Sequence, residues 1–113
     1  MSSLTLEALS AAGLLAPLDT HLVRTLDRLS GGGLSSLAAV AVALTSRAVR
    51  AGHVCVDLAA LGGTPVLADD GAAVEGLVHP PGVAWRNAVA ECAIVGPPDA
   101  ARPLVMDASG RLY

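Results

Sequence analysis

The sequence predicts a mainly α fold, a small bundle of about four helices followed by a C-terminal β-hairpin. Three observations predict it. The chain has 113 residues, 53% of them hydrophobic, which suits one small domain with its own core. Apolar residues recur at helical spacing in several segments. The last segment, "RPLVMDASGRLY", instead places a turn sequence between two short runs of strand-forming residues.

The first two helices are predicted from capping residues and from the glycines that follow them. The first helix extends from about Ser3, a residue type that caps helices, to Gly13. The second begins in "APLDTHLVRTLDRLS", where Asp19 is the expected N-cap and Leu18 and Val23 are spaced to pack across the cap. The glycine run that comes next ends this helix.

The third helix, "LSSLAAVAVALTSRAVRAG", is predicted to be the central one. It is apolar on every side from Leu37 to Leu44, which is typical of a buried helix. Arg47 and Arg50 lie in its last turns, where cations suit the helix dipole. Gly52 is expected to end it.

The middle of the chain is predicted to be less regular. Residues 53–56, "HVCV", are expected to be extended, and Asp57 is expected to cap the single helical turn "DLAAL". Residues 62–82 are rich in Gly and Pro and predict a long loop with a short helix near Ala72–Leu77. The sequence assigns no role to this loop.

The fourth helix is predicted over residues 83–96. Its apolar stripe consists of Trp85, Val89, Cys92 and Val95, and the Gly-Pro-Pro that follows stops it. After it comes the hairpin, with "PLVM" and "RLY" as strands and "DASG" as the turn. The chain ends inside the second strand, so we expect that strand to be truncated and the sequence to be a fragment of a longer protein.

Composition and charge argue against several functions. All seven basic residues are Arg, so the chain lacks the Lys that a phosphate-binding Walker A loop needs. A net charge of −3 argues against independent nucleic-acid binding. The longest apolar run is too short to cross a membrane, and the N-terminus does not read as a signal peptide. Only 15% of the residues are charged, against about 25% in an average chain, which predicts an exposed apolar patch.

His53, Cys55 and Asp57 alternate along the predicted extended segment, so their side chains point to one face. A structural zinc site needs four ligands, and a nucleophile must contact its base, whereas alternation aims the side chains in parallel. We therefore assign no catalytic, cofactor-binding or metal-binding residue. The favoured interpretation has Cys55 buried, Asp57 capping the next turn and His53 partly exposed. A small Cys/His-dependent metal protein or enzyme remains the alternative.

Four arginines are candidates for a partner interface. They are Arg24 and Arg28 on the second helix and Arg47 and Arg50 on the third. The alternative for each is a solvated position on a helix surface or end. Trp85 is expected in the core, with an interface anchor as the alternative.

From about residue 14 to the end, the chain resembles the N-terminal domain of RecD, the alpha subunit of exodeoxyribonuclease V (the RecBCD enzyme). The resemblance depends on the order and spacing of five stretches, which include "PLD", "GHVC", a Trp-containing helix, "PLV" and "RLY". The residues that mark the family are Pro17, Asp19, His53, Cys55, Trp85, Leu104, Arg111, Leu112 and Tyr113.

This resemblance implies that residues 1–113 are a single helical N-terminal domain of a longer 5′–3′ DNA helicase subunit, whose helicase domains follow Tyr113. It implies a non-catalytic docking role in double-strand break repair and recombination. ATP and Mg²⁺ would bind the parent protein only, and the partners would be the other subunits of a RecBCD-like complex. DNA would be reached through the parent, without a membrane, in the bacterial cytoplasm.

A self-associating helical module is a further alternative. The truncated hairpin leaves a strand edge that is expected to be open, and open edges pair with other chains. A homodimer formed through this edge is the expected consequence.

Overall fold

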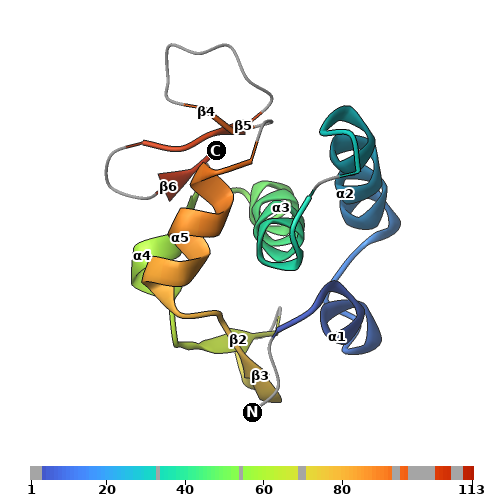
Figure 1. Ribbon diagram of the computed structural model, residues 1–113. Helices are drawn as coiled ribbons and strands as arrows, with labels where there is room; N and C mark the ends of the chain where they lie inside the picture. The colour runs from blue at the N-terminus through green and yellow to red at the C-terminus, as the bar shows by residue number, and fades with distance from the viewer. Residues whose placement is uncertain are drawn as a thin grey trace.

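The fold is built around one long helix, α3 (Ser36–Arg50), with α1 and α2 on one side and α4 and α5 on the other (Figure 1). The apolar stretch predicted to be central is buried, including Ala38 and every residue from Val40 to Thr45. Helices α1, α2 and α5 all contact α3. Ser35 caps its start through Oγ, and Gly52, at φ +94°, follows its end. The prediction of a central buried helix is confirmed.

The computed structural model describes residues 4–32, 34–53, 55–68, 71–92, 95–96, 104–107 and 111–113. Within these ranges the chain is mainly α, as predicted, with short strands. The helices are α1 (Leu6–Ala11), α2 (Pro17–Leu29), α3, the single turn α4 (Leu58–Leu61) and α5 (Gly82–Ala90). The strands are β1 (Val56–Asp57), β2 (Pro65–Leu67), β3 (Ala73–Val78), β4 (Val95–Gly96), β5 (Leu104–Val105) and β6 (Arg111–Leu112).

The predicted N-terminal caps of the first two helices are wrong, whereas both helices end at the predicted glycines. Helix α1 is capped by Thr5, whose Oγ1 accepts the Ala8 N–H at 3.1 Å. Helix α2 begins at Pro17, because proline suits a first helical position where no N–H donor is needed. Asp19 is thus the third residue of α2, and Leu18, 59% exposed, does not pack across the cap.

The segment predicted as a long loop with a short helix is a β-hairpin instead. Strands β2 and β3 pair antiparallel, with Pro65 opposite Val78 and Leu67 opposite Ala73. Two glycines with positive φ permit this course: Gly71 before β3, and Gly76 within β3, where L side chains are strained. Glycine in the middle of the expected helix would also have weakened it.

Helix α5 ends at Ala90, earlier than predicted. The Cys92 N–H donates to the Val89 carbonyl in a tighter turn, and Val95 pairs with Leu104 in the parallel pair β4–β5. Trp85 and Val89 are buried on α5, and Cys92 is half-buried just beyond it. The predicted apolar stripe therefore faces the interior although its last member belongs to a strand.

The predicted C-terminal hairpin is confirmed. Val105 and Tyr113 exchange both backbone hydrogen bonds, at 3.3 and 2.8 Å, and the Asp107 N–H donates to the Arg111 carbonyl at 3.1 Å. The turn at 108–110 lies outside the described residues. On its other side β6 pairs with β1, with Leu112 opposite Val56. The edge expected to be open is therefore occupied, which removes the basis for strand pairing through β6.

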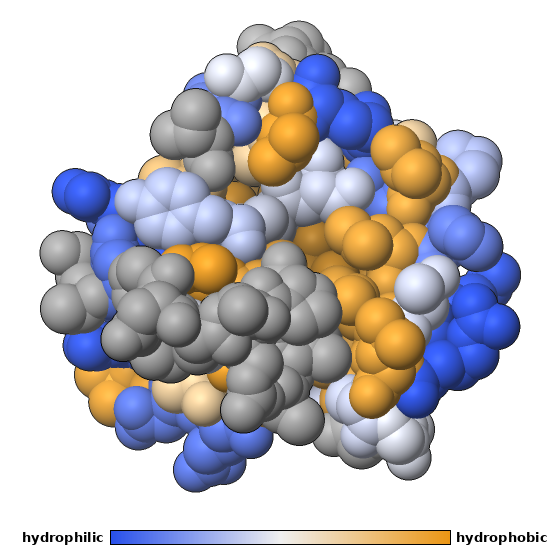
Figure 2. Space-filling view, turned by 90° about the horizontal axis from the view of Figure 1, so that it is seen from above, coloured by the Kyte–Doolittle hydropathy of each residue, from blue (hydrophilic) through white to orange (hydrophobic). Residues whose placement is uncertain are grey.

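The expected exposed apolar surface is present. Figure 2 shows apolar side chains gathered between polar ones on the upper face. The large apolar residues that are exposed include Leu18, Leu29, Val49, Leu67, Val78 and Val83. In the described part of the chain no helix is long and apolar enough to cross a membrane.

Candidate functional site

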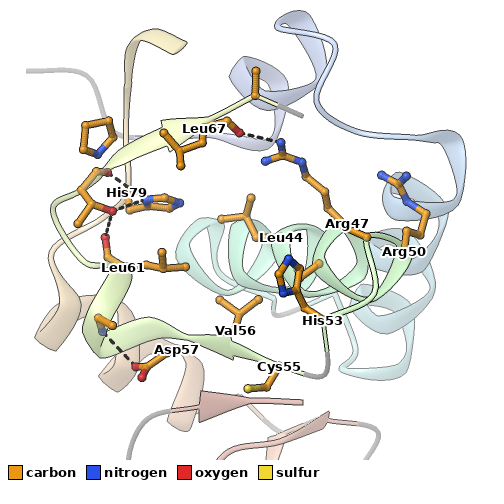
Figure 3. A pocket seen from close by; sticks show the side chains of 16 residues that line it. Leu44, Arg47, Arg50, His53, Cys55, Val56, Asp57, Leu61, Leu67 and His79 are labelled. Atoms are coloured by element: carbon orange, nitrogen blue, oxygen red, sulfur yellow. Dashed lines mark hydrogen bonds between the residues drawn. The ribbon is translucent and has the colours of Figure 1, made fainter. Parts of the chain in front are cut away.

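A hollow of about 860 Å³ lies between the end of α3, the β1–α4 segment and the β2–β3 hairpin (Figure 3). Its size falls within the range of sites that hold a small molecule or a few side chains. The end of α3 contributes Leu44, Arg47, Ala48, Arg50, Ala51 and His53. The other two segments contribute Cys55, Val56, Asp57, Ala60, Leu61, Thr64, Pro65, Leu67, Ala68 and His79.

All three residues of the alternating segment line this hollow. Asp57 Oδ1 accepts the Ala60 N–H at 3.0 Å, which confirms its role as the cap of α4. His53 is exposed, and its backbone N–H donates to the Ala48 carbonyl at 2.9 Å, just after the end of α3. Cys55 is half-buried at the wall of the hollow. The prediction that Cys55 is buried is wrong, because β1 enters the core only at Val56.

No group of three or more His, Cys, Asp and Glu residues in the described part of the chain is arranged to hold a metal ion. Asp57 uses Oδ1 for its capping bond. His79, which lies far from these three residues in the sequence, lines the same hollow from the opposite side.

Arg47 and Arg50 extend from the same end of α3 and are both tied into the fold. Arg47 Nη2 donates to the Leu67 carbonyl at 2.7 Å, which joins α3 to β2 across the mouth of the hollow (Figure 3). Arg50 grips the Asp19 carboxylate with two hydrogen bonds, Nε to Oδ1 at 3.0 Å and Nη2 to Oδ2 at 2.6 Å. These two arginines therefore hold the fold together around the hollow.

Asp19 is fully buried between α2 and α3. Its carboxylate also accepts the Ser46 hydroxyl at 2.6 Å and the Ala16 N–H at 2.8 Å. Burial raises the pKa of Asp19, but the hydrogen bonds from Arg50, Ser46 and Ala16 together with the Arg50 charge outweigh burial and leave it below its usual value. The sequence did contain a signal for the position of Asp19. A proline is favoured at the first position of a helix, and Pro17 there makes Asp19 the third residue of α2.

Arg24 and Arg28 are exposed on α2. The prediction that these two join Arg47 and Arg50 in a partner interface stays a prediction. The four arginines differ in the structure. Arg47 and Arg50 bind Leu67 and Asp19 within the fold, whereas Arg24 and Arg28 are exposed on α2.

His79 is the functional candidate that sequence reasoning missed, and only 7% of it is exposed. Its Nδ1 lies 2.9 Å from the Thr64 carbonyl and 3.0 Å from Thr64 Oγ1, whose own proton goes to the Leu61 carbonyl. A carbonyl only accepts, so Nδ1 carries the proton. Burial is the main cause that lowers the pKa of His79; the Arg47 charge adds to it, and the bond to Thr64 opposes it. His79 is therefore neutral at pH 7, with Nε2 an acceptor.

The indole of Trp85 stacks on the His79 ring, with centroids 5.6 Å apart and planes at 22°. Trp85 is fully buried, and its Nε1 donates to the Leu37 carbonyl at 3.0 Å. The core role predicted for Trp85 is confirmed. It also holds the His79 ring, which lines the hollow, from the side of the core.

The remaining family-marker residues have structural positions. Pro17 opens α2, and Leu104 and Leu112 are buried in the strands. Arg111 and Tyr113 are exposed, and the Tyr113 hydroxyl donates to Asp107 Oδ2 at 3.2 Å.

Comparison with known protein families gives a match over most of the chain. Residues 11–113 match the family described as "RecBCD enzyme subunit RecD, N-terminal domain". The matched range includes α2, α3 and every residue that lines the hollow. No curated protein and no solved structure matches the chain.

Proposed function

Because the chain belongs to the family of RecD N-terminal domains, we propose that it is the docking domain of a RecD-type helicase subunit. In this role it holds the subunit in a RecBCD-like complex and performs no chemistry itself. The match over residues 11–113 is the observation that carries the proposal.

The residues support a docking role in two ways. The chain has no lysine and thus no Walker A loop, so ATP and Mg²⁺ would bind to other domains of the parent protein. The described surface also exposes several large apolar side chains, as protein-binding surfaces do.

The parent protein, on this proposal, is an ATP-driven 5′–3′ DNA helicase subunit of exodeoxyribonuclease V that acts in double-strand break repair and recombination in the bacterial cytoplasm. The domain contacts the other subunits, and DNA is reached through the parent protein. The chain's net charge of −3 agrees with this division, because the phosphate backbone repels it.

The direct test is co-purification of the tagged 113-residue chain with the other two subunits of the same organism's enzyme. We expect a stable complex with one of them, and neither ATP hydrolysis nor measurable binding of a DNA duplex by the chain alone. Turnover of ATP by the purified chain, or no association with either subunit, would contradict the proposal.

The alternative of a Cys/His-dependent protein is tested at Cys55. If the chain is a docking domain, Cys55→Ala costs about 1 kcal/mol or less, because the thiol is only half-buried. Cys92→Ala, at the other half-buried thiol, serves as the matched control. Stoichiometric zinc in the purified chain that disappears in Cys55→Ala and persists in Cys92→Ala would establish the alternative instead.

A further inference from the structure

The hollow contains a hydrogen-bond acceptor that the fold leaves unused. Nδ1 of His79 donates to Thr64, which leaves Nε2 with a lone pair and, among the described residues, with no partner. Among the described residues, every fully buried side-chain nitrogen or oxygen has a hydrogen-bond partner. Nε2 has none among these residues, so it is not fully buried, and it is accessible from the hollow that His79 lines. Figure 3 shows the His79 ring pointing into this space, toward Leu44.

The ring holding this acceptor cannot turn away. Its Nδ1 is hydrogen-bonded to the Thr64 carbonyl, and Trp85 stacks against one of its faces. Because Nε2 is open to the hollow, water can bind it in the free chain, and a ligand that supplies a donor here replaces that water with a hydrogen bond of fixed direction. The acceptor is thus fixed in position before any ligand arrives.

The rest of the hollow is mainly apolar. Its walls are formed by Leu44, Val56, Leu61, Leu67 and several alanines. An occupant must therefore be mostly apolar and must carry one N–H or O–H group at its inner end. Among protein side chains, tyrosine and tryptophan combine a large apolar ring with one such donor.

The mouth favours an aromatic occupant over an aliphatic one. The guanidinium of Arg47 spans one side of the mouth and that of Arg50 lies near it, whereas Asp57 is the one carboxylate among the described residues that line the hollow. Arginine attracts the negative face of an aromatic ring even while it keeps its hydrogen bonds. The acceptor, the walls and the rim therefore select the same kind of side chain.

We propose that this hollow receives a tyrosine or tryptophan side chain of the partner subunit, whose O–H or N–H donates to His79 Nε2. The inference rests on the proposed docking function and names where the partner is held. Such an inserted aromatic side chain is the type of contact that carries most of the energy of a protein interface.

The first test uses analogues of the side chains with the 113-residue chain. Addition of p-cresol (for Tyr) or 3-methylindole (for Trp) is expected to shift the amide signals of Leu61, Thr64 and Leu67 and the ¹⁵N signal of His79 Nε2. Toluene, which lacks the donor, is expected to bind about three- to tenfold more weakly, the value of one net hydrogen bond. Equal affinity for toluene and p-cresol, or no shift at Nε2, would overturn the inference.

The second test blocks the hollow. Ala60 is exposed and lines it, so Ala60→Phe places a ring in the space intended for the partner. Ala11→Phe makes the same change at an exposed position of α1 outside the lining. We expect Ala60→Phe to abolish the p-cresol shifts and to weaken binding of the partner subunit at least tenfold, and Ala11→Phe to leave both unchanged. The thermal unfolding of each variant shows whether it has folded.

The possible failures are distinguishable. If the wild-type chain binds the partner subunit and Ala60→Phe binds it equally well, the inference is wrong and the docking function stands. If the wild-type chain binds neither subunit, the docking function itself fails. Binding of a DNA oligonucleotide that Ala60→Phe abolishes would assign the hollow to a different class of ligand and would also overturn the inference.

Discussion

At the scale of single residues, the positions that matter most are buried polar groups. Asp19 is fully buried, yet four hydrogen bonds from Ala16, Ser46 and Arg50 satisfy its carboxylate. An aspartate so placed is stable only with all its partners, because a buried charge without them costs several kcal/mol. Asp19 is recognisable in the sequence as a helix-start residue, but its ion pair is not, since the arginine that neutralises it is 31 positions away.

We predict that Asp19→Asn lowers the free energy of unfolding by about 2–3 kcal/mol. The loss is smaller than for a fully buried pair because 38% of the Arg50 side chain is exposed and water can solvate it. Urea unfolding followed by the fluorescence of Trp85, the sole tryptophan, measures the change. Glu7→Gln, at an exposed acid of α1, is the control and should be neutral. An Asp19→Asn variant as stable as the wild type would show that the ion pair contributes nothing net.

His79 should make stability depend on pH. Its pKa in the folded state is lowered, whereas the unfolded chain takes up a proton near pH 6.5. Below that pH the unfolded state binds more protons than the folded state, so stability falls as the pH drops from about 7 toward 5. His79→Gln should flatten this part of the curve, and His21→Gln, on the exposed side of α2, should not. An unchanged slope in His79→Gln would contradict the prediction.

At the scale of elements, local pattern predicted the central helix and the C-terminal hairpin well and the middle of the chain poorly. Helix α3 followed directly from its apolar residues and its caps. The hairpin β2–β3 did not, because its register contains a shift between Pro65 and Leu67 and its second strand contains Gly76 with positive φ. Neither irregularity has a signature in the order of polar and apolar residues.

The contact between α4 and α5 depends on a glycine. A Cβ at Gly62 would collide with the backbone of Gly82, at the start of α5. Backbone atoms cannot rotate out of the way as a side chain can, so we predict that Gly62→Ala destabilises the fold by about 1–3 kcal/mol. The φ of Gly62 is −51°, which alanine adopts freely, so the effect comes from the collision alone.

Gly13→Ala is the control for this experiment. A Cβ there meets nothing within 4 Å, but φ is +74°, so the expected cost of about 1 kcal/mol is conformational. Thermal unfolding of both variants separates the two causes. A Gly62→Ala variant more stable than Gly13→Ala would show that α5 moves aside easily.

At the scale of the whole molecule, backbone hydrogen bonds join the C-terminal strands β5 and β6 to strands that come earlier in the chain, β4 and β1. Met106 donates to Gly96 on one side, and Val105 exchanges hydrogen bonds with Tyr113 on the other. Since β6 also pairs with β1, the strands form the row β4–β5–β6–β1 beside the helices. The C-terminal hairpin is therefore held to the wall that carries Cys55 and Asp57.

Oligomeric state is the prediction that belongs to this scale. With both sides of β6 occupied, we expect the 113-residue chain to sediment as a monomer at micromolar concentrations. Equilibrium sedimentation at several concentrations measures this, and a version extended beyond Tyr113 is the control. A concentration-dependent dimer of the 113-residue chain, absent from the extended version, would restore the self-association alternative.

The sequence by itself determined the helical class, the buried central helix, the cap at Asp57, the C-terminal hairpin and the family. These depend on the spacing of apolar residues, on caps within four residues and on the order of short motifs, all of which are local. Tertiary structure alone decided that Asp19 pairs with Arg50, that β2 pairs with β3, and that His79 faces the alternating segment across one hollow. Each of these joins residues that are distant in the chain, and the free energy of such contacts depends on which surfaces fold together.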